Sequence, residues 1–176
     1  MRLFVAIRFN QETGSRLLAL RDELRTITER GRFTEPENLH LTLVFLGECD
    51  SQQAADARSA MDQIQFAAFL IQIDRIGRFQ RDRGNVWWAG VGESQPLLEL
   101  QQKLAEALTL AGFVLEKTRY SPHITLGRKV MTAIPPWTIE PFGEMVCQID
   151  LMVSEQIGGK LTYSPIYEKR CGDSGL

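Results

Sequence analysis

His40-Leu41-Thr42-Leu43 and His123-Ile124-Thr125-Leu126 share one pattern and lie 83 positions apart in a chain of 176 residues. They contain the only two histidines of the protein. One such tetrapeptide would carry little information, whereas two copies that use every histidine form a specific signal. Because side chains at positions i and i+2 of a strand share a face, we predict two strands that each present a histidine and a threonine together, over an aliphatic core.

The residues around the two tetrapeptides also repeat. Trp87 and Ala89 follow Phe4 and Ala6 by the same 83 positions, and in both halves an alternating stretch precedes a stretch of leucines at helical spacing. The simplest explanation is a duplicated strand–helix–strand unit, in register and without a gap. The alternative is that a chain of alternating strands and helices matches at one offset by chance.

Periodicity and punctuation divide the rest of the chain into further elements. Helices are expected after the N-caps Asn10, Ser51 and Ser94, with the first ending at Gly31 and the third at Gly112. Strands are expected at 3–9, 40–47, 68–76, 85–91, 123–127, 145–153 and 161–167, with a charged turn at 78–84.

Composition excludes several classes of protein. The net charge of −2 argues against a protein that grips long duplex nucleic acid, although it leaves room for a small basic cleft. No apolar run approaches the roughly 20 residues that span a bilayer, and the N-terminus lacks the core of a signal peptide. Cys49, Cys147 and Cys171 are odd in number and widely spaced, so we predict neither a disulfide framework nor a zinc site, and a reduced cytoplasm.

The repeated residue types suit acid–base chemistry at phosphorus. Histidine titrates near neutral pH, so one imidazole can accept a proton while the other donates one. A threonine hydroxyl can donate a hydrogen bond to a phosphate oxygen. If the duplicated units pack about a pseudo-twofold axis, His40, Thr42, His123 and Thr125 converge on one cleft. Such a pair suits in-line displacement, in which the nucleophile and the leaving oxygen lie on opposite sides.

Together with Arg2-Leu3-Phe4-Val5-Ala6-Ile7 and Ser121-Pro122-His123-Ile124-Thr125-Leu126-Gly127-Arg128, the paired motifs resemble the two-histidine phosphoesterase superfamily. The nearest branch is that of the RNA 2′,3′-cyclic phosphodiesterases, also called 2′-5′ RNA ligase-like or LigT-like proteins. The resemblance implies an α+β fold of two lobes, with antiparallel-rich sheets around a central cleft and helices outside. It covers nearly the whole chain, so we expect one two-lobed domain over 1–176 with a loose tail at about 171–176.

The resemblance also implies an activity and residue roles. The activity is metal-independent hydrolysis of an RNA 2′,3′-cyclic phosphate to a 2′-phosphate, with reversible 2′-5′ ligation in some relatives. His40 would donate a proton to the departing 3′ oxygen, and His123 would accept one from water. Thr42 and Thr125 would hold the non-bridging oxygens. From the residues alone the two histidines are equivalent.

Four further residues are predicted to bind substrate, each with a plainer alternative. Phe4 would stack on a base or serve as a core aromatic, and Phe45 and Tyr120 flank the motifs and would contact substrate or only pack. Arg128 would bind phosphate, although strict alternation points it away from His123 unless the strand bends at Gly127.

Two less specific features lie between the motifs. Trp87 and Trp88 cannot both face the core of a regular strand, so one is expected to be partly exposed or at a lobe interface. Arg78, Arg81 and Arg83 form a basic turn that would steer RNA or simply be solvated.

Other functions stay open at this point. The same chemistry would act on the cyclic phosphate of a nucleotide or of ADP-ribose, and a non-catalytic RNA- or nucleotide-binding module is a third reading. A zinc protein is disfavoured, because two histidines and scattered cysteines do not supply a tetrahedral ligand set. We expect no cofactor, no metal, no membrane, no obligate protein partner, and a cytoplasmic monomer that binds RNA 3′ ends or small cyclic-phosphate nucleotides.

Overall fold

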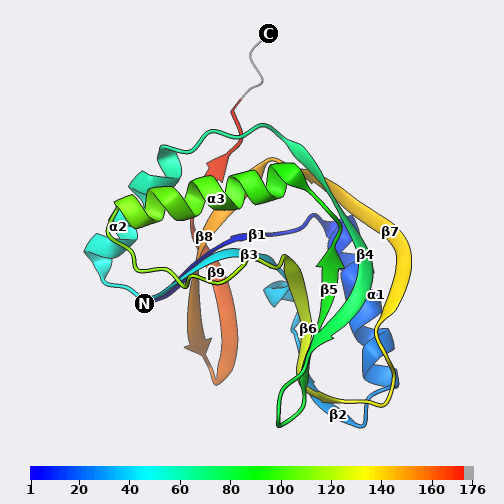
Figure 1. Ribbon diagram of the computed structural model, residues 1–176. Coiled ribbons are helices and arrows are strands. Elements are labelled where there is room, and N and C mark those ends of the chain that lie inside the picture. Colours follow the sequence, from blue (N-terminus) through cyan, green and yellow to red (C-terminus); the bar gives the residue numbers. More distant parts are fainter. Residues whose placement is uncertain (173–176) are drawn as a thin grey trace.

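The computed structural model describes residues 1–172 and folds them into two antiparallel sheets with helices around them (Figure 1). The first sheet has the order β3-β1-β8-β9 and the second the order β2-β6-β5-β4-β7. The strands are β1 (Arg2–Ile7), β2 (Arg30–Phe33), β3 (Leu41–Glu48), β4 (Phe69–Phe79), β5 (Asn85–Val91), β6 (His123–Met131), β7 (Trp137–Val146), β8 (Gln148–Ile157) and β9 (Lys160–Arg170). The helices are α1 (Gln11–Thr26), α2 (Ser51–Asp62), α3 (Gln95–Leu110) and the 3₁₀ turn η1 (Pro36–Asn38).

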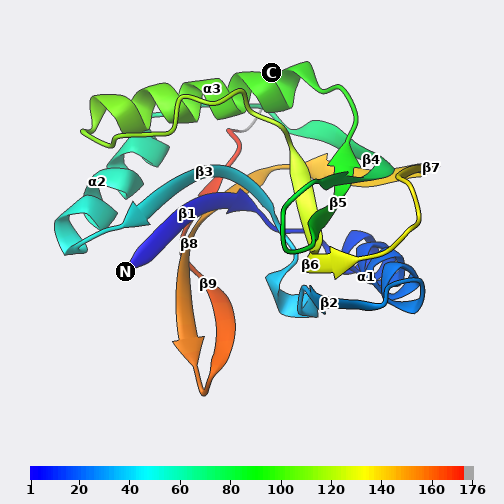
Figure 2. The same ribbon diagram turned by 60° about the horizontal axis from the view of Figure 1, so that its bottom comes forward.

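The two sheets repeat one arrangement. Strand β1 lies between β3 and β8, and β5 lies in the same way between β6 and β4. Both motif strands, β3 and β6, follow a strand–helix unit and approach each other between the sheets (Figure 2). The predicted α+β fold with two antiparallel sheets is confirmed.

The register of the repeat differs by one residue from the prediction. Thr42 pairs with Ala6, whereas Thr125 pairs with Trp88. The first strands of the two units therefore correspond at an offset of 82, while the motif strands correspond at 83. The prediction of a gapless repeat was wrong, because the connection between the paired strands is one residue longer in the second unit.

The helices follow their caps, with one exception. The side chains of Asn10 and Ser94 accept hydrogen bonds from backbone amides of the first turns of α1 and α3. Helix α2 begins one residue early, because Asp50 rather than Ser51 is its N-cap and forms a capping box with Gln53. Helix α1 ends at Thr26, and Gly31 lies in β2 instead of ending the helix.

Two strands were missed, and one prediction about cysteines was wrong. Strand β2 has only four residues, and β7 contains a proline, so neither gave a recognisable strand pattern. Cys147 and Cys171 form a disulfide with a Cα–Cα distance of 4.9 Å. Their spacing of 24 residues looked wide, but the β8–β9 hairpin brings them opposite each other. Cys171 and Gly172 are held by backbone hydrogen bonds, so the loose tail does not begin there, and 173–176 lie outside the described residues.

Helices and sheets are interleaved along the chain. Helix α1 leaves the first sheet after β1 and packs against β2, β6 and β7 of the second. Helix α3 leaves the second sheet after β5 and contacts β3 and helix α2 (Figure 1). A largely continuous core therefore runs through both lobes. Within residues 1–172, no helix is long and apolar enough to cross a membrane.

Candidate active site

A β-bulge follows the threonine of the first motif. Two consecutive residues of β1 pair with Thr42 and Val44, so Leu43 is an extra residue in β3. Leu43 and Val44 are both buried as a result, and the next residue, Phe45, turns outward and is 63% exposed. Without the bulge, Phe45 would lie on the face opposite Thr42.

The second motif contains the same bulge at the equivalent place. Two consecutive residues of β5 pair with Thr125 and Gly127, so Leu126 is the extra residue and both Leu126 and Gly127 are buried. Arg128 is therefore exposed on the face of His123 and Thr125, despite strict alternation. Its charge lowers the pKa of both His40 and His123, which places it near both imidazoles.

Both imidazoles are fixed by the backbone two residues before them. His40 Nδ1 lies 2.7 Å from the carbonyl oxygen of Asn38, and His123 Nδ1 lies 2.7 Å from that of Ser121. A carbonyl only accepts, so each Nδ1 carries a proton and the chemistry falls to Nε2. Nε2 of His40 lies 2.9 Å from the Thr42 hydroxyl. The described chain offers the Nε2 of His123 no hydrogen-bond partner.

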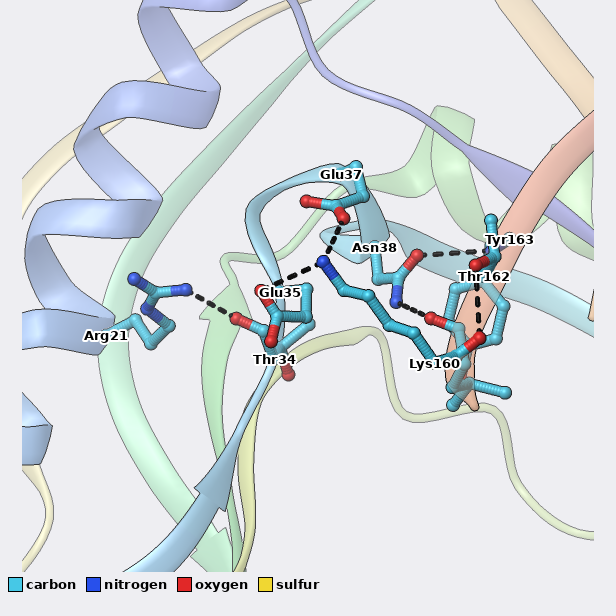
Figure 3. Close-up of polar contacts among 9 residues, drawn as sticks. Arg21, Thr34, Glu35, Glu37, Asn38, Lys160, Thr162 and Tyr163 are labelled. Carbon is cyan, nitrogen blue, oxygen red and sulfur yellow. Dashed lines mark hydrogen bonds and ion pairs between the residues drawn. The ribbon is translucent and has the colours of Figure 1, made fainter. Parts of the chain in front are cut away.

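The carbonyl that holds His40 is itself anchored (Figure 3). The buried amide of Asn38 donates to the carbonyl of Leu161 at 2.8 Å and accepts from the backbone N–H of Tyr163 at 3.2 Å. Beside it, Lys160 pairs with Glu37 at 2.8 Å. Turn η1 is thus tied to β9, on another part of the chain. Sequence reasoning missed Asn38, and its position two residues before the histidine was the only available signal.

Aromatic rings surround each histidine. The rings of Phe4 and Tyr163 lie 4.9 and 5.2 Å from that of His40. Phe4 is only 3% exposed, so it packs against the histidine, and the prediction that it stacks on a base is not supported. Its alternative as a packing aromatic fits this position.

On the second side the rings are more open. Phe79 and Trp88 lie 4.9 and 6.2 Å from the His123 ring, and both are half-buried. Trp87 is fully buried, so the two neighbouring tryptophans face opposite sides of β5, as the sequence predicts.

A cavity of about 620 Å³ opens beside the motifs. Thr42, Phe45, Tyr120 and His123 contribute to its wall, together with residues of α3 and of the segment 114–119. Its size suits a nucleotide-sized ligand. The Tyr120 hydroxyl donates to the carbonyl of Thr42 at 2.8 Å, and burial raises its pKa, so it stays protonated and braces the motif strand.

Electrostatics favour neutral imidazoles in the free protein. Burial lowers the pKa of His40 and of His123 below the usual value, and the positive charge of Arg128 lowers both further. The hydrogen bonds to Asn38 and Ser121 oppose this shift only in part. A bound phosphate anion would act in the opposite direction, because a negative charge favours the imidazolium. The site can therefore take up a proton together with its anion.

The family model described as "LigT like Phosphoesterase" matches residues 7–88. An RNA 2′,3′-cyclic phosphodiesterase of Archaeoglobus fulgidus is 32% identical over 152 residues, covering 82% of this chain and 85% of the relative. A protein of the same name from Aeropyrum pernix is 32% identical over 171 residues, covering 91% and 97%. The crystal structure of Escherichia coli LigT with 3′-AMP superposes with a TM-score of 0.86, at 28% identity and 97% coverage of both chains.

Proposed function

The chain belongs to the family of LigT-like phosphoesterases, and from this membership and the paired motifs we propose that it hydrolyses the 2′,3′-cyclic phosphate at an RNA end. The observation that carries the proposal is the duplicated histidine–threonine site. Both Nδ1 atoms are bonded to carbonyls, which leaves two Nε2 atoms for proton transfer. A phosphate held between them would be attacked from one side and released on the other.

We further propose that His40 is the acid and His123 the base. The two nitrogens of His40 lie near two oxygens, the carbonyl of Asn38 and the hydroxyl of Thr42, and both can accept from a protonated ring. His123 Nε2 has a free lone pair that suits removal of a proton from water. The bond from phosphorus to the 3′ oxygen then breaks, the proton of His40 passes to that oxygen, and the 2′-phosphate remains.

The remaining residues would hold the substrate. Thr42 and Thr125 would donate to the non-bridging oxygens, and Arg128 would balance their negative charge. Phe45, exposed on the wall of the cavity, would stack on the terminal base. Tyr120 would act indirectly, through its hydrogen bond to the first motif strand.

We also propose that the reaction needs no metal ion and that the protein works as a cytoplasmic monomer. The acid, the base and the charge-balancing arginine are all side chains of this one chain. The Cys147–Cys171 disulfide would be reduced in the cytoplasm. Because β8 and β9 are paired along their whole length, we expect the hairpin to stay formed when this bond is reduced.

The test uses a short RNA that ends in a 2′,3′-cyclic phosphate, incubated with the protein and EDTA. Phosphorus NMR should identify a single 2′-phosphate product. A 3′-phosphate product would contradict the assigned acid, and activity lost with EDTA would contradict the metal-free mechanism. Cleavage of a cyclic mononucleotide or of ADP-ribose cyclic phosphate, but not of RNA, would replace RNA as the substrate.

A further inference from the structure

The exposed charges of the two sheets differ on the faces that flank the motifs. Beside the first motif, Phe45 of β3 pairs with Phe4 of β1, which in turn pairs with Met152 of β8. Phe4 and Met152 are both buried. On this face Arg8 is paired with Asp150 at 2.8 Å and with Glu168 at 3.1 Å, whereas Arg2 of β1 lines the cavity beside Phe45. Among the described residues, the first sheet therefore places an unpaired arginine, Arg2, on this face.

The second sheet carries cations on the side of His123. Arg32 of β2 pairs with Arg128 of β6, and antiparallel partners present their side chains on the same face. Arg32 therefore lies beside Arg128, whose charge lowers the pKa of both histidines. Phe33 points to the opposite face, where it packs under Gly127.

A groove continues from Arg32 toward the far end of β6. Arg30, Arg32, Arg83 and Lys129 line it, with Asp82 as its one carboxylate. Within residues 1–172, none of these four cations forms a salt bridge. The tip of the β4–β5 hairpin and β2 form its sides at the lower end of the second sheet (Figure 1). Lys129 lies six residues after His123, which is about 20 Å along a strand.

An aromatic surface lies between the histidine and this groove. The Trp88 indole lies over Gly77, where even a Cβ would come within 2.3 Å of the ring. Phe79 packs beside it with a centroid distance of 5.3 Å, and Arg81 lies over Phe79. Aromatic faces next to arginines are the combination that binds single-stranded RNA, through stacked bases and paired phosphates.

We propose that the RNA strand leading to the cyclic phosphate runs across the second sheet, from Trp88 to the groove of Arg30, Arg32, Arg83 and Lys129. The proposal rests on the proposed function for the position of the terminal phosphate. It adds that single-stranded RNA of several nucleotides is the preferred substrate class. A mononucleotide is too short to reach the far end of the groove, where Arg83 and Lys129 lie.

The test measures binding and hydrolysis separately. Binding uses a fluorescent octanucleotide RNA with a terminal 3′-phosphate, which this chemistry does not cleave, titrated at several salt concentrations. The variants are Arg32→Ala/Arg83→Ala and a control with the same charge change on the outer helices, Arg58→Ala/Lys103→Ala. Loss of two phosphate contacts should raise Kd roughly tenfold and reduce the slope of log K against log salt by about 1.4. The control should match the wild type, and the groove variant should lose less affinity for a dinucleotide than for the octanucleotide.

Hydrolysis then distinguishes failure of the surface from failure of the activity. The ratio of kcat/KM on a cyclic-phosphate octanucleotide to that on a cyclic mononucleotide should fall roughly tenfold in the groove variant. An unchanged salt slope, or an equal loss in the control, would overturn the RNA surface whatever the protein hydrolyses. Normal octanucleotide binding without hydrolysis of any cyclic phosphate would overturn the activity and retain the surface. Arg32→Lys/Arg83→Lys, which keeps both charges, should retain most of the affinity.

Discussion

The two motifs share a backbone and differ in what surrounds it. Each has a histidine bonded to a carbonyl two residues earlier, and each has a bulge after its threonine. The residue after the bulge is Phe45 in one motif and Arg128 in the other. The same strand geometry thus presents an aromatic ring on one side of the proposed phosphate site and a cation on the other. The pseudo-symmetry places Phe45 and Arg128 at equivalent positions, and the difference between these two side chains gives the two sides of the site different properties.

The histidines also differ in how firmly they are held. His40 is the more enclosed, between Phe4 and Tyr163 and behind the Asn38 anchor. His123 depends on the carbonyl of Ser121, an exposed residue. A fixed donor and a more open acceptor fit an acid that must meet one leaving oxygen and a base that must admit water.

The largest expected effect is loss of either histidine. His40→Ala and His123→Ala should each lower kcat by roughly 10²- to 10⁴-fold. A substrate with a 3′-sulfur leaving group needs no acid, so it should restore much of the activity of His40→Ala and little of that of His123→Ala. Rescue of His123→Ala but not of His40→Ala would show that His123 is the acid and His40 the base.

Changes at the residues after the bulges should be smaller and of different kinds. Arg128→Gln should lower kcat/KM by roughly 10²-fold, because a charge on the phosphate is lost in the transition state. Phe45→Ala should mainly raise KM, by roughly tenfold, through lost stacking. Phe45→Tyr is the control that keeps a ring. If Arg128→Gln changed only KM, its part in the transition state would be refuted.

The anchor behind His40 should matter more than its counterpart. Asn38→Ala removes two hydrogen bonds between a buried side chain and the backbone of β9, at a cost of about 1–3 kcal/mol of stability. As a positioning residue it should also lower kcat at unchanged KM. Ser121→Ala is the matched control, because only its backbone oxygen holds His123; its stability should stay within about 0.5 kcal/mol. Equal effects of the two changes would remove the proposed asymmetry.

The pH dependence should respond to Arg128. His123 must be neutral to act as base, and its pKa is lowered by burial and by Arg128, so the acid limb of the kcat/KM profile of the wild type should lie below about pH 6.5. Arg128→Gln removes one cause of the lowered pKa and should move this acid limb to higher pH. NMR titration can check it directly, since the chain has two histidines. An acid limb that moved to lower pH would contradict the sign.

A weaker effect concerns stability. Both histidines have folded-state pKa values below the unfolded value, so the unfolded chain binds more protons in acid. Their contribution to stability is present above about pH 6.5 and is lost as the pH falls through the folded pKa values. Urea unfolding at several pH values should show a smaller decline in His40→Gln than in the wild type.

Patterns along single strands were readable from the sequence, and contacts across strands were not. Alternation placed Thr42 beside His40 and Thr125 beside His123, because that relation lies within one strand. Alternation failed for Arg128, because a bulge depends on how β6 pairs with β5. Asn38 escaped notice because its partners lie more than 120 residues away. The cysteine pairing was missed for the same reason, since it follows from the β8–β9 hairpin.

The interleaving of helices and sheets has a consequence for motion. The chain passes from the first sheet to the second and back repeatedly, so no single cut would release either lobe as a continuous segment. Helices α1 and α3 each follow a strand of one sheet and pack against strands of the other, so a hinge between the lobes would have to displace both helices at once. Calorimetry should therefore record one cooperative melting transition. The distance between the two imidazoles is therefore set when the chain folds, and we expect substrate to bind without closure of the lobes.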